Sequence, residues 1–466
     1  MRAMPCVPLL CAVVISGFSF GFTTSRADEF PKDPNNITSL TPEQARKVLE
    51  TANPRALSLN QLRTLDPDTA KVLAGYSGDE IYLDGLATLD ANAAKALASF
   101  KGRLLRLNGL TVLSPDAAKG LAAFKNILSL DGLATLDKAI AAALAEPGDN
   151  GATLRTRGLA LNGVQTLHVD AAKALARVNS GTLVLNGLRT VDADTTNAIA
   201  GYKGDELNLD GLASLSADAA KGLAAFRGES LRLNGLTTLD ANAAQELAKF
   251  KGRWLFLNGL NTLEASTAKS IAEFKGYGLF LNRVKTLDSS AAAALVKYEG
   301  QWLHLNGVAT LEADAAEALA GFTGDELILN GLASLSADAA KALAGFDGER
   351  LGLAKLTFYA DALTPETARL VLRDAGSDSV SLPNITAFHS PDSIAIARAL
   401  AALKVPLSLP NLKKISPKTL SALLEKEDVE IPPIETLELI REPDGSATED
   451  FVIPEGFQKR QRAQKQ

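Results

Sequence analysis

The sequence predicts an α/β fold: a right-handed solenoid of about 16 strand–turn–helix coils, each of about 24 residues, with a parallel sheet on one face. Three observations support this prediction. A Leu-x-Leu segment returns at a fixed step, Asn or Asp followed by Gly comes directly after most copies, and an alanine-rich segment with helical spacing of its apolar residues comes next. A fixed period of roughly 20–50 residues is typical of stacked repeats, because one such unit cannot bury its apolar face alone.

The second leucine of the Leu-x-Leu segment marks each coil, and most successive markers differ by one full repeat, as Leu209 and Leu233 do. The regular markers are Leu59, Leu83, Leu107, Leu130, Leu161, Leu185, Leu209, Leu233, Leu257, Leu281, Leu305, Leu329 and Leu353. More loosely spaced equivalents follow at Leu382, Leu409 and Ile431. The long step between Leu130 and Leu161 leaves extra residues around 146–151, which we interpret as a surface loop. A calcium loop is the alternative, but only two acidic residues are present there.

The copy at 207–226 shows what each part of a coil is expected to do. Leu207 and Leu209 alternate with Asn208, so the leucines face inward and Asn208 faces outward. Ser216 is placed to cap a short helix, as Asp is in many other copies. The apolar stripe of this helix falls at i, i+4 and i+7: Ala219, Leu223 and Phe226.

Two glycine columns and one Asn/Asp column repeat with the coils. We expect the turn glycines, such as Gly211, to be selected for a positive φ, and Gly228 to end the helix. We expect the Asn and Asp side chains to bond the backbone of the next coil rather than to form a binding ladder. That column is Asn60, Asp84, Asn108, Asp131, Asn162, Asn186, Asp210, Asn234, Asn258, Asn282, Asn306 and Asn330.

The N-terminal segment 1–27 is predicted to be a secretory signal peptide. Arg2 precedes an apolar run, and Ser25-Arg26-Ala27 provides small residues before a cleavage point. An uncleaved anchor is the alternative. Cys6 and Cys11, the only cysteines, lie in this segment, so the mature chain is expected to have no disulfide and no thiol chemistry. The predicted location is secreted, periplasmic or at the cell envelope, with no stable membrane span after cleavage.

The rest of the chain divides into four predicted parts. Residues 28–57 form an N-terminal cap, in which Thr41 caps a helix with Pro42 at its first position and Gln44 as the capping-box partner. Residues 58–354 form the regular array, and 355–441 form divergent repeats with a C-terminal cap. Residues 442–466 form a polar, basic tail that we interpret as solvated, with a tether to an anionic envelope polymer as the alternative.

The charge balance argues against two classes of partner. The formal net charge is −6, and removing Arg2 and Arg26 with the signal segment makes it −8. Such an excess of carboxylates disfavours a general binder of nucleic acid or of anionic membranes.

The pattern LxL(N/D)GLxTLxxxAAxALAxF, over roughly residues 35–437, resembles the leucine-rich repeat family. It is most similar to the bacterial surface-protein subclass, the BspA-like repeats, and the late copies 382–385 and 409–412 carry the proline that this subclass has after its strand. The sequence departs from the family in two ways: Asn or Asp directly follows the second leucine, and the convex segment is a longer, alanine-rich helix. The resemblance implies a role in protein interaction without naming a ligand.

No convincing catalytic constellation is present. The three histidines (His168, His304 and His389) fall at unrelated positions of the repeat, and no HExxH, GxSxG or Walker sequence occurs. The aspartates recur as caps and turns, which explains their spacing. The sequence therefore predicts a protein that is not an enzyme and that has no cofactor and no metal site.

The outward positions of the strands hold the best candidate for a ligand site. Both tryptophans, Trp254 and Trp302, fall in one column with Gly278 between them, which predicts indoles roughly 10 Å apart. The neighbouring column carries Phe256, Phe280 and His304, and Arg283 replaces the turn glycine of the Phe280 coil. An exposed aromatic patch here is typical of sugar stacking or peptide binding. The alternative is that aromatic residues merely suit strands or pack under a loop.

These patterns favour an exported, non-enzymatic binding or scaffold protein that recognises a protein or a polysaccharide through its strand face. The expected ligand-binding residues are Trp254, Phe256, Phe280, Trp302 and His304. The alternative function is a structural component of the cell envelope that acts by lateral self-association.

Overall fold

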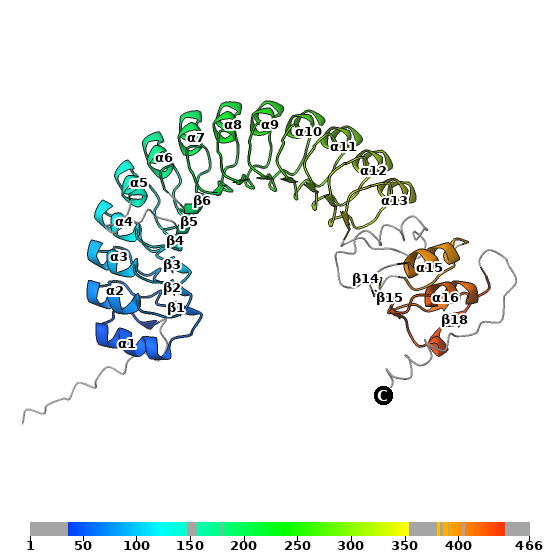
Figure 1. Ribbon diagram of the computed structural model, residues 1–466, viewed down its shortest axis with the longest axis horizontal. Helices are drawn as coiled ribbons and strands as arrows, with labels where there is room; N and C mark the ends of the chain where they lie inside the picture. The colour runs from blue at the N-terminus through cyan, green and yellow to red at the C-terminus, as the bar shows by residue number, and fades with distance from the viewer. Residues whose placement is uncertain are drawn as a thin grey trace, which may run out of the picture.

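The chain forms a leucine-rich-repeat-like solenoid. The computed structural model describes residues 36–146, 156–178, 180–353, 380–382, 385–389, 391–402 and 406–442. Thirteen parallel strands form one sheet in simple sequence order, β1 to β13. Figure 1 shows these strands along the inside of an arc and the helices along its outside. The predicted α/β solenoid is confirmed. The predicted signal peptide 1–27 and the inserted residues 147–151 lie outside the described residues.

The strands of the main sheet are short and evenly spaced. They are β1 (Ala56–Ser58), β2 (Glu80–Tyr82), β3 (Leu104–Arg106), β4 (Ile127–Ser129), β5 (Thr156–Ala160), β6 (Ser180–Val184), β7 (Glu206–Asn208), β8 (Ser230–Arg232), β9 (Trp254–Phe256), β10 (Gly278–Phe280), β11 (Trp302–His304), β12 (Glu326–Ile328) and β13 (Arg350–Gly352). Each strand pairs with the next so that equivalent positions of successive coils face one another, for example Leu255 with Leu279.

The helices on the outside of the arc are also short. They are α1 (Pro42–Thr51), α2 (Pro67–Leu73), α3 (Ala91–Leu97), α4 (Pro115–Leu121), α5 (Lys138–Ala145), α6 (Val169–Leu175), α7 (Ala193–Ile199), α8 (Ala217–Ala224), α9 (Ala241–Leu247), α10 (Ala265–Ile271), α11 (Ser289–Leu295), α12 (Ala313–Ala320) and α13 (Ala337–Leu343). Among the described residues, no helix is long and apolar enough to cross a membrane.

The core is built from the same positions in every coil. Leu207 and Leu209 are buried and Asn208 between them is partly exposed, as the alternation predicts. Behind the strands, aromatic rings stack in two runs, from Tyr76 to Phe124 and from Tyr202 to Phe346. Phe226 and Phe250, for example, lie parallel with centroids 6.0 Å apart. One coil buries too little apolar surface to stand alone, so each coil depends on its neighbours.

Helix ends follow the predicted capping. The hydroxyl of Thr41 accepts from the Gln44 N–H and the Gln44 side chain accepts from the Thr41 N–H, which completes the expected capping box at α1. Ser216, at the start of α8, accepts from the N–H of Ala219. These bonds satisfy backbone donors that the first helical turn leaves without partners.

The reasons predicted for the two glycine columns, a positive φ at Gly211 and a helix end at Gly228, were both wrong. Helix α8 ends at Ala224 with Ala225 as its cap, before Gly228, and a Cβ at Gly228 would lie 2.2 Å from the Phe226 ring. At the turn, Gly211 has no positive φ; a Cβ there would lie 1.9 Å from the carbonyl oxygen of Asn186 in the preceding coil. Both columns are therefore glycine because another part of the stack comes too close for a side chain.

A second group of elements lies in the C-terminal part of the chain. It contains β14 (Val380–Ser381), α15 (Ser393–Ala401), β15 (Leu407–Ser408), β16 (Lys414–Ile415), α16 (Pro417–Leu424), β17 (Val429–Glu430), the 3-10 helix η3 (Ile434–Thr436) and β18 (Glu438–Leu439). Strands β14, β15 and β17 form a parallel sheet, and each precedes one of the three looser repeat markers. Glu442, at the start of the predicted tail, is buried and accepts from the N–H of Lys418.

Candidate functional site

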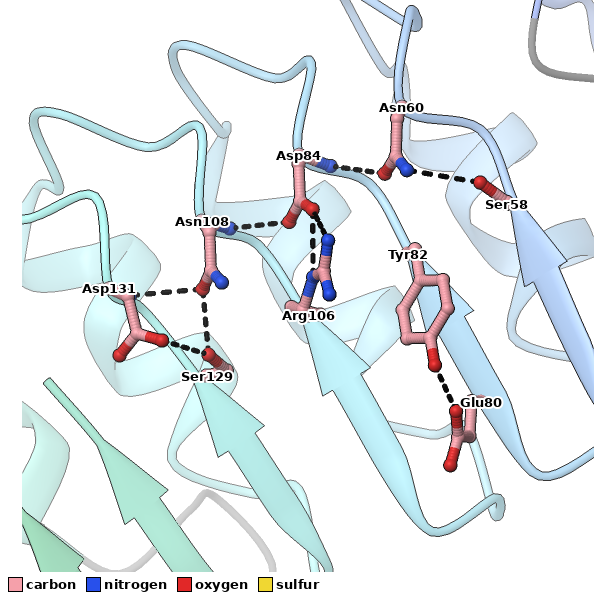
Figure 2. Close-up of polar contacts among 9 residues, drawn as sticks. All are labelled: Ser58, Asn60, Glu80, Tyr82, Asp84, Arg106, Asn108, Ser129 and Asp131. Carbon is pink, nitrogen blue, oxygen red and sulfur yellow. Dashed lines mark hydrogen bonds and ion pairs between the residues drawn. The ribbon is translucent and has the colours of Figure 1, made fainter. Parts of the chain in front are cut away.

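The Asn/Asp column is a structural ladder, as the sequence predicts. The backbone N–H of each column residue donates to the side-chain oxygen of the column residue one coil earlier, beginning with Asp84 N–H to Asn60 Oδ1 at 3.2 Å. Eleven such bonds, 2.8–3.2 Å long, connect Asn60 to Asn330 without a break. Figure 2 shows the first three. Because these oxygens already serve the backbone, we do not assign the column to a ligand.

The polar side chains at the N-terminal end of the sheet bind one another (Figure 2). The Tyr82 hydroxyl donates to the Glu80 carboxylate and lowers its pKa. Arg106 forms an ion pair with Asp84, and its guanidinium lies 4.6 Å from the centroid of the Tyr82 ring. These hydrogen bonds and ion pairs, within one coil and between neighbouring coils, hold the polar side chains of the strand face in defined positions.

The two indoles lie much closer together than predicted. Trp254 on β9 and Trp302 on β11 occupy the same register position, with Gly278 of β10 between them. Their ring centroids are 4.9 Å apart with planes tilted by 47°. The predicted separation of roughly 10 Å follows from the spacing of the strand backbones, whereas the side chains lean together over Gly278. A Cβ at Gly278 would lie 2.8 Å from the Trp254 ring, so this contact requires glycine.

The second column forms a stack along the sheet. The rings of Phe256 and Phe280 are nearly parallel with centroids 4.3 Å apart. The His304 ring meets Phe280 edge-on at 4.6 Å. On the other side, the Arg232 guanidinium lies 4.8 Å from the centroid of Phe256. This packing leaves Phe280 only 9% exposed, so of the five expected residues it offers the least surface.

Two residues of the cluster were not predicted. Tyr277 contacts both indoles edge-on, at 5.2 Å from Trp254 and 5.4 Å from Trp302. The guanidinium of Arg253 lies over both the Trp254 and Tyr277 rings. Both belong to the column that immediately precedes the strands, where Asp205 and Glu229 stand in earlier coils. In the sequence, these two residues could have been found from the change in that column from Asp205 and Glu229 to Arg253 and Tyr277. We call Trp254, Phe256, Tyr277, Phe280, Trp302 and His304 the aromatic patch.

Charged residues border the aromatic patch on two sides. Arg232 lies 3.7 Å from Glu206 and 3.5 Å from Asp210, and burial raises the pKa of Glu206. At the other side, Glu326 lies 3.6 Å from His304 Nε2 and 3.8 Å from Arg350.

His304 is held in its neutral form. Burial, together with the nearby positive charge of Arg350, lowers the pKa of His304 to about 4. Its Nε2 has no hydrogen-bond partner in the described structure. At neutral pH the His304 ring therefore acts as an uncharged member of the aromatic stack.

The described residues contain no cluster suited to a metal ion. Among them, no group of three or more His, Cys, Asp or Glu side chains is arranged to hold a metal ion. His168 occupies the position that caps α6 but makes no capping bond, and it lies on a different coil from His304.

A hollow on the outer side of the arc is a weaker candidate. It has a volume of about 720 Å³, lies between α3 and α4, and includes Gly120 in its lining. Four lysines line it: Lys95, Lys101, Lys119 and Lys125. Lysines near helix C-termini are favoured by the helix dipole, so their position has a structural explanation.

No family model matches the sequence, and no curated protein matches it. Among solved structures, the chain is similar to one in the Toll–Spatzle complex, described as a molecular hub in Drosophila development and innate immunity, with 13% identity and a TM-score of 0.47. It is also similar to a chain of the TLR13–ssRNA13 complex (16% identity, TM-score 0.46) and to one of the yeast Rad7–Elc1 complex (16%, TM-score 0.36).

The matches cover most of this chain but differ in how much of the other chain they include. They cover 78% of this chain and 55% of the Toll-complex chain, 86% and 61% for the TLR13 complex, and 87% and 94% for Rad7–Elc1. The chain thus spans less than two thirds of the first two. This chain's own sheet and coils define its solenoid fold.

Proposed function

We propose that this protein is an exported, non-enzymatic binding protein that holds a partner polypeptide on the aromatic patch of its strand face. The concentration of rings on three neighbouring strands carries the proposal. In the outward columns of β1 to β13, every aromatic residue except Tyr82 belongs to the patch. The repeat itself needs no aromatic residue there, because most other coils place small, polar or aliphatic residues at these positions. Export rests on the signal-like segment 1–27, and the BspA-like sequence pattern supports a surface role.

The ring geometry favours a polypeptide over a polysaccharide. Sugars bind aromatic residues by stacking on an open ring face. Rings whose centroids are 4.3 Å apart and nearly parallel lie face to face, so Phe256 and Phe280 cover one face of each other. Arg232 covers the other face of Phe256, and Arg253 lies over Trp254. The patch therefore presents mainly ring edges, which suit apolar side chains of a protein partner.

The composition of the patch matches that of a binding hot spot. Trp, Tyr and Arg are enriched among the few residues that dominate the free energy of protein association. Trp254, Tyr277 and Trp302 are each partly exposed, and all three are held in place by their mutual contacts. Such fixed side chains lose little conformational freedom when a partner binds.

Tryptophan fluorescence provides the test, because Trp254 and Trp302 are the only tryptophans of the chain. Residues 28–466 are titrated in parallel with a panel of synthetic peptides and with envelope polysaccharides. We expect a saturable change of emission with a peptide, which is lost in Trp254→Ala and Trp302→Ala. Tyr82→Ala, an aromatic residue of the same face outside the patch, is the matched control and should leave it intact. A response to polysaccharides alone, or to no probe, would reject the proposal.

Lateral self-association is a second candidate, because one flat side of the arc carries a row of capping carboxylates and the other exposes several lysines and arginines. The side where strands lead into helices carries capping carboxylates: Asp66, Asp90, Asp137, Asp192, Asp240 and Asp288. The side where helices lead back to strands carries exposed cations: Lys101, Lys125, Lys203, Arg227, Lys251 and Lys275. These cations are interspersed with carboxylates such as Asp205, Glu229 and Glu299. Carboxylates of one side can pair with cations of the other in head-to-tail contact between copies.

Light scattering at several salt concentrations separates the two candidates. Lateral association through these sides predicts a particle mass that rises with protein concentration at low salt and falls to that of a monomer at high salt. A monomer at every salt concentration would leave the aromatic patch as the remaining basis for function.

A further inference from the structure

Three cations beside the aromatic patch form no ion pair within the described structure. Arg253 immediately precedes β9, whereas Arg283 and Lys285 follow β10, so they stand at opposite ends of the strands. All three side chains are exposed. Arg253 contacts only aromatic rings, and no described carboxylate lies within ion-pair distance of Arg283 or Lys285. This differs from Arg232 and Arg350, which lie beside carboxylates.

The strands beneath the patch contain no carboxylate. Strands β9, β10 and β11 consist of Trp-Leu-Phe, Gly-Leu-Phe and Trp-Leu-His. The carboxylates nearest in the outward columns, Glu206 and Glu326, already lie beside arginines. The strands of the patch are therefore free of carboxylates, and three cations stand at their ends with one exposed carboxylate, Glu229, in the coil before Arg253, although the chain as a whole has a net charge of −6.

Arg283 stands where the stack favours glycine. In the preceding coil, a Cβ at Gly259 would lie 2.2 Å from the carbonyl oxygen of Asn234, and in the following coil a Cβ at Gly307 would lie 2.7 Å from that of Asn282. Two other non-glycine residues hold this column in the coils marked Leu59 to Leu353, and both stand at an end of the array. Gln61 belongs to the first coil, where no earlier strand lies beneath it, and Lys355 belongs to the last. Packing does not select arginine at 283, and its exposed guanidinium is available for a contact outside the chain.

We propose that the partner is an acidic polypeptide segment that lies over β9 to β11 and runs from one end of these strands to the other. An aromatic or aliphatic side chain of this segment contacts the aromatic patch, and carboxylates on either side of it pair with Arg253 and with Arg283 and Lys285. The two cationic borders are at most about 20 Å apart, the length of roughly six residues of extended peptide. This inference rests on the proposed function, because it specifies the chemistry of the partner that the patch holds.

Three related synthetic peptides test the charge requirement by fluorescence anisotropy. Each contains the same phenylalanine and leucine residues, flanked by glutamate in one, serine in the second and lysine in the third. We expect the glutamate peptide to bind most tightly, and its affinity to fall as salt is added. The lysine peptide should have the lowest affinity.

The matched variants restore the residues that other coils use, which protects the fold. Arg283→Gly reproduces Gly259, Lys285→Ala reproduces Ala309, and Arg253→Glu reproduces Glu229. Arg283→Gly and Lys285→Ala should each weaken binding of the glutamate peptide by up to about fivefold, as expected for exposed ion pairs, and should leave binding of the serine peptide unchanged. Arg253→Glu reverses a charge and uncovers the Trp254 ring, so it should weaken binding of the glutamate peptide more than binding of the serine peptide. Lys269→Ala, on the exposed face of α10, is the control and should change neither.

The outcomes separate the two levels of the proposal. If all three peptides bind equally and Trp254→Ala abolishes their binding, the patch binds a polypeptide but the charge inference is wrong. If the lysine peptide binds as tightly as the glutamate peptide, the charge inference is also rejected. If no peptide binds, or if only a polysaccharide does, the proposed function fails and the inference fails with it.

Discussion

The side-chain oxygen of Asn258 accepts a hydrogen bond from the backbone N–H of Asn282, 3.0 Å away in the next coil. The same bond recurs along the ladder wherever Asn or Asp holds this position. An N–H at this turn has no strand partner, so the ladder oxygen prevents a partly buried donor from losing its hydrogen bond.

Replacing a ladder residue should therefore depend on whether an acceptor oxygen remains. We expect Asn258→Ala to lower the free energy of unfolding by about 1–3 kcal/mol, because the Asn282 N–H loses its acceptor. Asn258→Asp should be nearly neutral, since Asp84 and Asp210 perform the same role elsewhere. Urea denaturation followed by circular dichroism measures both. Equal losses in the two variants would show that the amide group, and not an acceptor oxygen, is needed.

The turn glycines should not tolerate even a methyl group. In Gly211→Ala the new Cβ would meet the Asn186 carbonyl oxygen at 1.9 Å, so the stacked coils must separate. We expect a loss of about 1–3 kcal/mol, typical of overpacking. Gly201→Ala, where the nearest atom would be 3.3 Å away, is the control and should change stability much less. Thermal unfolding compares the two, and similar melting temperatures would contradict the steric explanation.

The neutral, buried state of His304 should make stability depend on pH. Its pKa falls from 6.5 to about 4 on folding, so between these values the unfolded chain binds the proton more readily. The stability linked to this group is complete above pH 6.5 and is lost as the pH falls toward 4, by up to about 3 kcal/mol. His304→Phe keeps a ring in the stack and should remove this part of the pH dependence. Parallel stability curves for the two proteins between pH 7 and 4 would contradict the assignment.

Gly278→Ala should disturb the two indoles without unfolding the coils. Its Cβ would lie 2.8 Å from the Trp254 ring, so the contact between Trp254 and Trp302 must open. We expect altered near-ultraviolet circular dichroism and tryptophan emission, with an unchanged far-ultraviolet spectrum. An unchanged near-ultraviolet spectrum would mean that the ring moves aside at no cost to the pair.

The repeat period of the sequence was enough to predict the solenoid, because coils of equal length stack with their equivalent positions side by side. It also predicted which aromatic residues share the strand face. It did not predict the direction in which Trp254 and Trp302 lean, since that depends on the space over Gly278. Tyr277 was missed because it lies before the strand, in a column whose other residues are mostly charged or polar. The glycines were explained wrongly because the atom that excludes a side chain at Gly211 is a carbonyl oxygen of the preceding coil.

The ladder has a consequence for the length of the protein. Within the ladder, from Asn60 to Asn330, each side-chain oxygen serves the next coil and Asn and Asp serve equally, so the ladder does not restrict which of these coils are neighbours. Whole coils can therefore be added or removed by duplication or deletion, because the new neighbours form the same ladder hydrogen bond. The chain carries a trace of such growth: Gly-Asp-Glu at 78–80 returns at 204–206 and 324–326, and its glutamates begin β2, β7 and β12, five strands apart each time. A functional face then needs to arise in only one block, while the copies around it hold the shape.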